Sequence, residues 1–223
     1  QGDILISSTA KKIITVEEQL WPHGIVYYTV DETMGKQLGI VQEAMRIIMG
    51  KTCVKFQRIY PNENGRYPVQ SWVHIIGNYS GCTSDLGRNP FGGPSILNLN
   101  VDTCFDVIGH ALHELLHTLG VYHEHIRPDR DQHIDIIWDN IKDGNAHNFQ
   151  LLNVNVVRDY GLPYDYDSIM HYSITAFSKD KFLPTIVPKV GVCIYIYFFT
   201  LTFRPSVICV SNYYKYITWH TLL

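Results

Sequence analysis

Three histidines, a glutamate and a glycine lie within eleven residues at spacings that a hydrolytic zinc site requires. His113 and His117 are four residues apart, so on a helix their imidazoles share one face, one turn apart. Gly120 follows, where a helix can end in a left-handed conformation that costs glycine nothing. The chain can then turn back, so that His123 can supply a third ligand.

Glu114 directly follows the first histidine and is placed to take a proton from a metal-bound water. Zinc in hydrolytic sites usually has three protein ligands and keeps a fourth position for water. That water loses its proton near neutral pH, and a general base such as Glu114 would receive it and pass it to the leaving amine. The HExxH pattern alone would arise by chance in roughly one or two of a hundred such chains, and the pattern extended by Gly120 and His123 in about one in ten thousand. The alternative is a histidine-rich helix that binds no metal.

A helix is predicted for the ligand-bearing segment without reference to the histidines. Apolar residues recur along Asp106–Leu119 at helical spacing, and they occupy positions 107, 108, 111, 112, 115, 116 and 119. Earlier in the chain, helical spacing of apolar residues also predicts a helix over 34–49. Composition and alternation of apolar residues predict strands at 25–30, 53–59, 72–76 and 95–101. After Asp131 regular patterns become sparse, although 134–157 keeps some helical spacing. Mixed strands and helices followed by irregular segments predict the α+β class.

The bulk properties exclude several classes of protein. A chain of 223 residues is long enough for one domain or for two subdomains that share a cleft. The net charge of −3 and the lack of a basic run give no support to a nucleic-acid partner. The longest apolar run, Val192–Phe203, is shorter than the roughly 20 residues of a membrane span, so we expect none. The five cysteines indicate disulfides in an oxidising compartment with one cysteine left over; they are Cys53, Cys82, Cys104, Cys193 and Cys209.

The stretch from His113 to Asp131, HELLHTLGVYHEHIRPDRD, resembles the signature of the astacin metallopeptidases of the metzincin group. The residues after the third histidine carry much of the resemblance, and a second family element is present as Ser168-Ile169-Met170-His171-Tyr172. The resemblance implies a two-subdomain zinc protease whose cleft lies near residue 123. The implied protease would have an N-terminal mixed sheet with helices and an irregular C-terminal subdomain.

The same resemblance implies the parts of the site. One catalytic zinc ion would be bound by His113, His117 and His123. Met170 would lie in a tight turn under the metal, and Tyr172 would be a switchable ligand that stabilises the tetrahedral intermediate. The implied protein is a secreted zinc endopeptidase that acts on protein or peptide substrates.

The start of the chain resembles the latency motif of astacin precursors. Gln1-Gly2-Asp3 is similar to the end of a Phe-x-Gly-Asp motif whose aspartate occupies the water position on zinc. Asp3 would then be a ligand from the chain's own pro-segment, with residues 1–12 as its remnant and Lys11-Lys12 as the activation region. Cleavage there would leave a new amino terminus near Ile13 or Ile14, buried near Glu124. The alternatives are a terminus with no role and a solvated pair of lysines.

The cysteines and the C-terminal end complete the resemblance only in part. Cys82 and Cys104 match a family disulfide that precedes the active-site helix. Cys53 matches a cysteine that normally pairs near the C-terminus, and here Cys193 and Cys209 are both open as its partner. The catalytic domain is expected over 13–189, whereas 190–223 forms an atypical hydrophobic segment. That segment motivates the alternative function, a catalytically impaired protein that binds zinc or a partner.

The remaining histidines have plainer interpretations. His110 precedes His113 by three residues and could compete for the metal, but it lies a turn early and no partner pattern accompanies it, so a metal-binding role is not expected. His125, His133, His147 and His171 are interpreted as hydrogen-bonded structural residues or surface positions.

Overall fold

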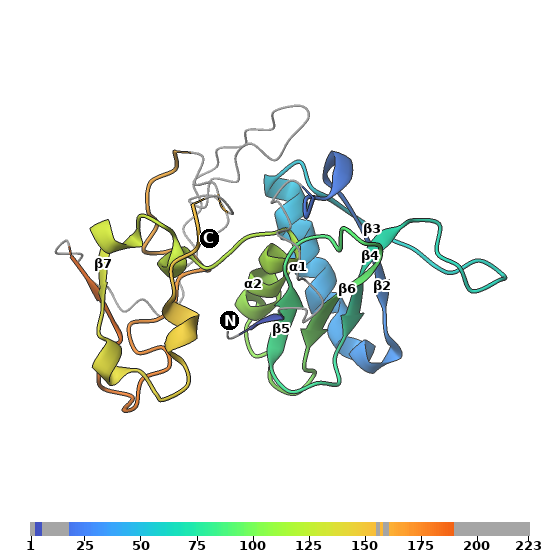
Figure 1. Cartoon of the computed structure of the whole chain (residues 1–223). Helices are drawn as coiled ribbons and strands as arrows, with labels where there is room; N and C mark the ends of the chain where they lie inside the picture. Colours follow the sequence, from blue (N-terminus) through green and yellow to red (C-terminus); the bar gives the residue numbers. More distant parts are fainter. Residues whose placement is uncertain (1–2, 6–17, 155–156, 158–160, 190–223) are drawn as a thin grey trace. The chain divides into compact units, whose positions relative to one another are not determined.

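The computed structural model describes residues 3–5, 18–154, 157 and 161–189, and these form two compact units (Figure 1). The first unit ends at Val121 and the second begins at Tyr122. Three features of the sequence lie outside the described residues. They are the Lys11-Lys12 pair, the expected new terminus at Ile13 or Ile14, and the segment 190–223 with Cys193 and Cys209.

The first unit is built on a six-stranded mixed sheet in the order β1-β5-β6-β4-β2-β3 (Figure 1). The strands are β1 (Ile4–Leu5), β2 (Ile25–Val30), β3 (Lys55–Arg58), β4 (Ser71–Ile76), β5 (Cys82–Asp85) and β6 (Gly93–Leu99). Neighbouring strands are parallel except β5 and β6, which run antiparallel. Buried β-branched and leucine side chains from β2, β4 and β6 form the sheet's part of the core. The predicted N-terminal mixed sheet is confirmed.

Two helices pack against each other beside this sheet, α1 (Leu38–Lys51) and α2 (Ile108–Thr118), and α2 also contacts β5 and β6 (Figure 1). Each helix buries one apolar face, as the spacing predicted. The buried apolar side chains are Val41, Ala44, Met45 and Ile48 on α1 and Ala111, Leu112, Leu115 and Leu116 on α2. The polar residues Glu114, His117 and Thr118 of α2 are buried as well, so the helix that bears the histidines lies in the core of the unit.

Two local predictions differ from the structure. The helix expected from Met34 begins at Leu38, because Gly35 takes φ 43° and ψ −125° and leaves the 3₁₀ turn η2 (Glu32–Gln37) before it. Strand β5 lies in a stretch for which no strand was predicted. Its sequence, Cys-Thr-Ser-Asp, has no apolar alternation, and it forms a strand because β6 and β1 both pair with it.

The second unit is irregular, as predicted, and contains the two-stranded sheet of β7 (Ile134–Ile136) and β8 (Ile186–Pro188). The described part of this unit also contains four short 3₁₀ helices, η3 (Glu124–Ile126), η4 (Arg130–Gln132), η5 (Trp138–Asn140) and η6 (Ala146–Phe149). Its core consists of Ile134, Ile141, Phe149, Tyr164 and Ile186. The stretch that keeps some helical spacing, 134–157, forms β7 and two 3₁₀ turns in its described part, and Gly144 within it has φ 81°. Its apolar residues Ile134, Ile141 and Phe149 belong to this small core.

The predicted disulfide between Cys82 and Cys104 is confirmed and ties β5 to the turn that leads into α2. Closing a loop of this size contributes about 3 kcal/mol in the chain-entropy description. Cys53 is exposed and has no disulfide partner among the described residues.

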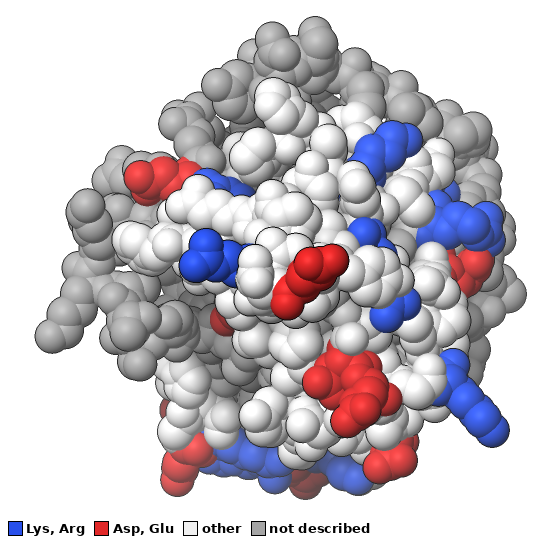
Figure 2. Space-filling view, turned by 90° about the vertical axis from the view of Figure 1, so that its right-hand side faces the viewer, with Lys and Arg blue, Asp and Glu red and all other residues white. Residues whose placement is uncertain are grey.

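The described residues include no helix that could span a membrane, and the face drawn in Figure 2 has no continuous basic patch. Within the described residues no helix is both long and apolar enough to cross a bilayer. On the face drawn in Figure 2, basic and acidic side chains are interspersed among uncharged residues. That face therefore lacks the continuous basic patch that nucleic-acid binding requires.

Candidate metal centre

The C-terminal end of α2 is held by donors from three separate segments. The carbonyl of His117 accepts from the backbone N–H of Gly87 at 2.8 Å and from that of Gly120 at 2.8 Å. The indole N–H of the buried Trp21 donates to the carbonyl of Thr118 at 2.8 Å. Gly120 has φ 93°, so the helix ends in the left-handed conformation that the sequence predicted. Because the last-turn carbonyls have partners, the last turn of α2, which carries His117, is fixed in place.

Four side chains could together hold a metal ion: Asp3, His113, His117 and His123. Each offers one ligand atom, and all four atoms lie within 4.8 Å of one another. Imidazole nitrogens and a carboxylate oxygen are common zinc ligands, so the donor set fits zinc. His110 is not in this group; its Nδ1 lies 3.0 Å from Oδ1 of Asp106.

Asp3 lies against both helical histidines. Its Oδ2 is 2.9 Å from Nε2 of His113, and its Oδ1 is 3.7 Å from Nε2 of His117. The backbone places it there, since the carbonyl of Asp3 accepts from the N–H of Ser84 at 2.9 Å as β1 pairs with β5. The carboxylate of Asp3 therefore faces the Nε2 atoms of both histidines, which are the atoms that could bind a metal ion.

The orientation of His117 suits metal binding. Its Nδ1 lies 2.7 Å from the carbonyl oxygen of Val121, which can only accept, so Nδ1 carries the proton. The lone pair is then on Nε2, the nitrogen that faces the group. Burial lowers the pKa of His117, which keeps the ring neutral as a ligand must be.

Glu114 is buried, with 2% of its surface exposed, and lies one residue from His113 on α2. Burial first, and the negative charge of Asp3 second, raise the pKa of Glu114 to about 9. In this arrangement the carboxyl is protonated at neutral pH. A nearby cation, or removal of Asp3, would lower its pKa towards the range of a general base.

The predicted Met170 turn lies in the second unit, directly against the residue after the third histidine. The backbone N–H of Glu124 donates to the carbonyl of Met170 at 2.9 Å. The N–H of Met170 in turn donates to the Ser168 hydroxyl at 3.1 Å, and the Met170 side chain is 1% exposed. The turn is therefore tied to the chain one residue after His123.

Tyr172 lies among aromatic rings of the second unit. Its ring stacks on His125 with centroids 3.8 Å apart, and its centroid is 4.6 Å from that of His123. His125 is fully buried, and burial lowers its pKa to about 2, so it stays neutral. The structure thus places the predicted tyrosine beside the third histidine, held by a neutral imidazole.

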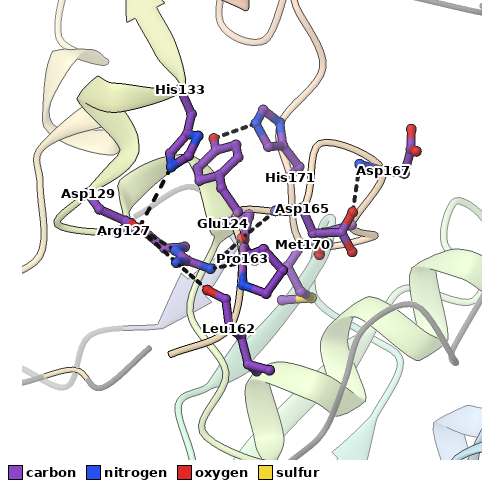
Figure 3. Close-up of polar contacts among 12 residues, drawn as sticks. Glu124, Arg127, Asp129, His133, Leu162, Pro163, Asp165, Asp167, Met170 and His171 are labelled. Atoms are coloured by element: carbon purple, nitrogen blue, oxygen red, sulfur yellow. Dashed lines mark hydrogen bonds and ion pairs between the residues drawn. The ribbon is translucent and has the colours of Figure 1, made fainter. Parts of the chain in front are cut away.

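Arg127 organises a polar network that the sequence did not reveal (Figure 3). A guanidinium has five N–H donors, and the structure provides five acceptors for this one. They are the carboxylate oxygens of Asp129 (2.9 and 2.9 Å), Oε1 of Glu124 (2.9 Å) and the carbonyls of Leu162 (2.9 Å) and Pro163 (3.2 Å). One side chain therefore joins the segment after His123 to the loop that leads into the Met170 turn.

Glu124 and His171 complete this network. Oε1 of Glu124 also accepts from the N–H of Asp165 at 2.9 Å. Burial is the largest influence on the pKa of Glu124, and it raises that pKa. Nδ1 of His171 donates to the Tyr172 carbonyl at 2.7 Å, so Nε2 accepts from the Tyr164 hydroxyl at 2.6 Å (Figure 3). His171 is thus a hydrogen-bonded structural residue, as its plainer interpretation predicted.

Comparison with known families gives one match over most of the chain. Residues 13–195 match the peptidase family described as Astacin. The zinc metalloproteinase nas-14 of Caenorhabditis elegans is 38% identical over 183 residues, which cover 81% of this chain and 34% of that protein. The astacin-like metalloprotease toxin 1 of Loxosceles intermedia is 40% identical over 185 residues, 81% of this chain and 66% of the toxin.

A solved structure has the same fold. High choriolytic enzyme 1, a hatching-enzyme zinc protease from medaka (Oryzias latipes), superimposes with a TM-score of 0.68 at 34% identity, covering 78% of this chain and 82% of that one. Bone morphogenetic protein 1 of Xenopus laevis is 38% identical over 78% of this chain but over only 24% of its own length. The chain therefore spans about a third or less of several curated relatives that it matches.

Proposed function

The chain belongs to the astacin family of zinc metallopeptidases, and from this membership we propose that it is a secreted endopeptidase that hydrolyses peptide bonds of protein substrates. The observation that carries the proposal is the group of three histidines and Asp3 beside the buried Glu114. The catalytic domain is proposed to span 13–189. The disulfide between Cys82 and Cys104 supports secretion, because such bonds persist in oxidising compartments. The family match does not favour the alternative of an impaired binding protein.

His113, His117 and His123 are proposed to hold a single zinc ion. Bound there, zinc would supply Lewis acidity and lower the pKa of a water molecule to near neutrality. The chain's own contribution is to fix the three rings. The carbonyl of Val121 sets the tautomer of His117, and the bonds at the end of α2 hold its last turn.

Glu114 is proposed to accept a proton from the attacking water and to deliver it to the leaving amine. Its burial removes competing solvent, and the helix holds it one residue from His113. Tyr172 is proposed to donate a hydrogen bond to the oxyanion of the tetrahedral intermediate. Its stacking on the neutral His125 supports this role, because a fixed donor costs little reorganisation during the reaction.

Residues 1–12 are proposed to be a pro-segment remnant that keeps the enzyme latent through Asp3. The contacts of Asp3 with Nε2 of His113 and His117 support this, since the carboxylate faces the nitrogens that would bind zinc. Cleavage after Lys12 would detach it. Glu124 would then receive the new terminus near Ile13 or Ile14, although its Oε1 already accepts from Arg127 and Asp165.

Replacing the proposed base tests the function. After cleavage by a trypsin-like protease, Glu114→Gln should keep its zinc and lose hydrolysis of a denatured protein by roughly a hundredfold or more. The exposed Glu32→Gln is the matched control and should cleave at the wild-type rate. Zinc content and turnover are measured on the same samples, and wild-type turnover by Glu114→Gln would contradict the assigned mechanism.

A separate variant tests latency. Asp3→Ala should hydrolyse the substrate without prior cleavage, whereas the uncut wild-type chain should be nearly inactive. Cleavage after Lys12 should raise the wild-type rate to that of the variant. If cutting changes neither rate, Asp3 has no latency role.

A further inference from the structure

Asn78-Tyr79-Ser80 follows β4 and has the N-x-S pattern of an N-glycosylation acceptor. It is the only N-x-S or N-x-T triplet in the 223-residue sequence. Such a triplet is a modification site only if its asparagine is on the surface of a chain that passes through the secretory pathway. The environment of Asn78 in the structure addresses the first condition.

Residues on both sides of Asn78 are fixed through their backbones. The N–H of Gly77 donates to the Thr33 hydroxyl at 3.1 Å, and its carbonyl accepts from the N–H of Val101 at 3.2 Å. Gly77 has no room for a side chain, because an added Cβ would lie 2.7 Å from Cγ1 of Val101. The main chain directly before Asn78 is therefore buried and packs closely against Val101 of the first unit.

After Asn78, the buried side chain of Asn98 on β6 holds the loop. Its Oδ1 accepts from the N–H of Tyr79 at 3.2 Å, and its amide donates to the carbonyls of Tyr79 and Gly81 at 3.1 and 2.7 Å. The amide of Asn100 adds a bond to the Tyr79 carbonyl at 3.0 Å. These inward bonds hold the loop through the backbones of Tyr79 and Gly81, and none of them uses the side chain of Asn78.

The side chains of the triplet point outward instead. Asn78, Tyr79 and Ser80 are all exposed, and 64% of the Tyr79 surface is accessible. The Asn78 amide and the Ser80 hydroxyl form no hydrogen bond with any described residue, whereas Asn62 and Asn89 accept from backbone N–H groups of their own turns. A substituent on the Asn78 amide would therefore displace no bond and enter no packed space.

We propose that Asn78 carries an N-linked oligosaccharide on the loop between β4 and β5. The donor class is a lipid-pyrophosphate-linked oligosaccharide, used by a transferase of the secretory pathway. The Asn78 amide nitrogen forms a bond to C1 of the terminal N-acetylglucosamine and loses one proton. The C1–O bond to pyrophosphate breaks, and the lipid pyrophosphate leaves with the electron pair. The proposal rests on the secretory route of the proposed function, but not on peptidase activity.

The test expresses the chain behind a secretion leader in eukaryotic cells and compares gel mobility before and after peptide-N-glycosidase treatment. Wild type should migrate faster after treatment, and mass spectrometry should find aspartate at position 78. Asn78→Gln and Ser80→Ala should lose the shift, and Ser80→Thr should keep it. Asn64→Gln, an exposed asparagine outside any such triplet, is the matched control and should also keep it.

A secreted wild-type chain with no shift overturns the proposal, as does a shift that persists in Asn78→Gln. Hydrolysis of a denatured protein by the cleaved chain is measured in parallel and should be unchanged in Asn78→Gln. An inactive chain that still carries the oligosaccharide would contradict the peptidase proposal alone, so the two failures are distinguishable.

Discussion

The end of α2 and the Arg127 network position the candidate site in different ways. On α2, residues 113–117 are set by helical geometry, so one short segment presents two imidazoles and a carboxyl at fixed spacing. Around Arg127, the guanidinium gathers acceptors from residues 124–129 and from 162–163, over thirty positions later in the chain. The first arrangement is encoded locally, whereas the second exists only once the second unit has folded.

The difference predicts how each region responds to substitution. A locally encoded site depends on backbone conformation, so a substitution is destabilising where the new residue cannot adopt the required φ without strain. A network that is closed by one side chain is sensitive to the geometry of that side chain. Arginine and glycine substitutions in the two regions separate these causes.

Arg127→Lys is expected to have the larger effect. Lysine has three donors on one nitrogen and cannot replace a five-donor fork, so several of the five acceptors around Arg127 lose this donor. We expect the free energy of unfolding to fall by about 3 kcal/mol, measured by urea denaturation.

The control is Arg46→Lys, which changes an arginine paired with Glu43 at the same i,i+3 spacing. That pair is exposed, with 70% and 43% of the two side chains accessible, so Arg46→Lys should leave the free energy of unfolding almost unchanged. Equal effects of the two substitutions would show that the network adds nothing beyond an ordinary surface ion pair.

Gly120→Ala is expected to have the smaller effect. An added Cβ has space, since its nearest contact is Gly87 Cα at 4.0 Å, but alanine at φ 93° is strained. We expect a loss of about 1–2 kcal/mol of unfolding free energy.

Gly39→Ala in the first turn of α1 is the matched substitution. Nothing lies within 4 Å of its added Cβ and its backbone is helical, so alanine should stabilise the protein by about 0.4–1 kcal/mol. Opposite signs at the two glycines are the expected result of the urea measurements. A neutral Gly120→Ala would mean that the left-handed end of α2 is not required.

The same contrast explains what could be predicted from the sequence. Both helices and the strands β2, β4 and β6 have strong apolar periodicity, and the positions of Gly120 and the two helical histidines follow from local geometry. Strand β5 was missed because its polar residues form a strand only through pairing with β6 and β1. The role of Arg127 was missed because its acceptors include backbone carbonyls, which leave no trace in residue types.

The central claim is that a zinc ion on His113, His117 and His123 is required for peptide hydrolysis. The most direct test measures zinc content and turnover of a denatured protein by the cleaved chain, before and after chelation and after adding zinc back. We predict about one zinc ion per chain, loss of turnover on removal and recovery on restoration. Full turnover by the zinc-free chain would contradict the claim.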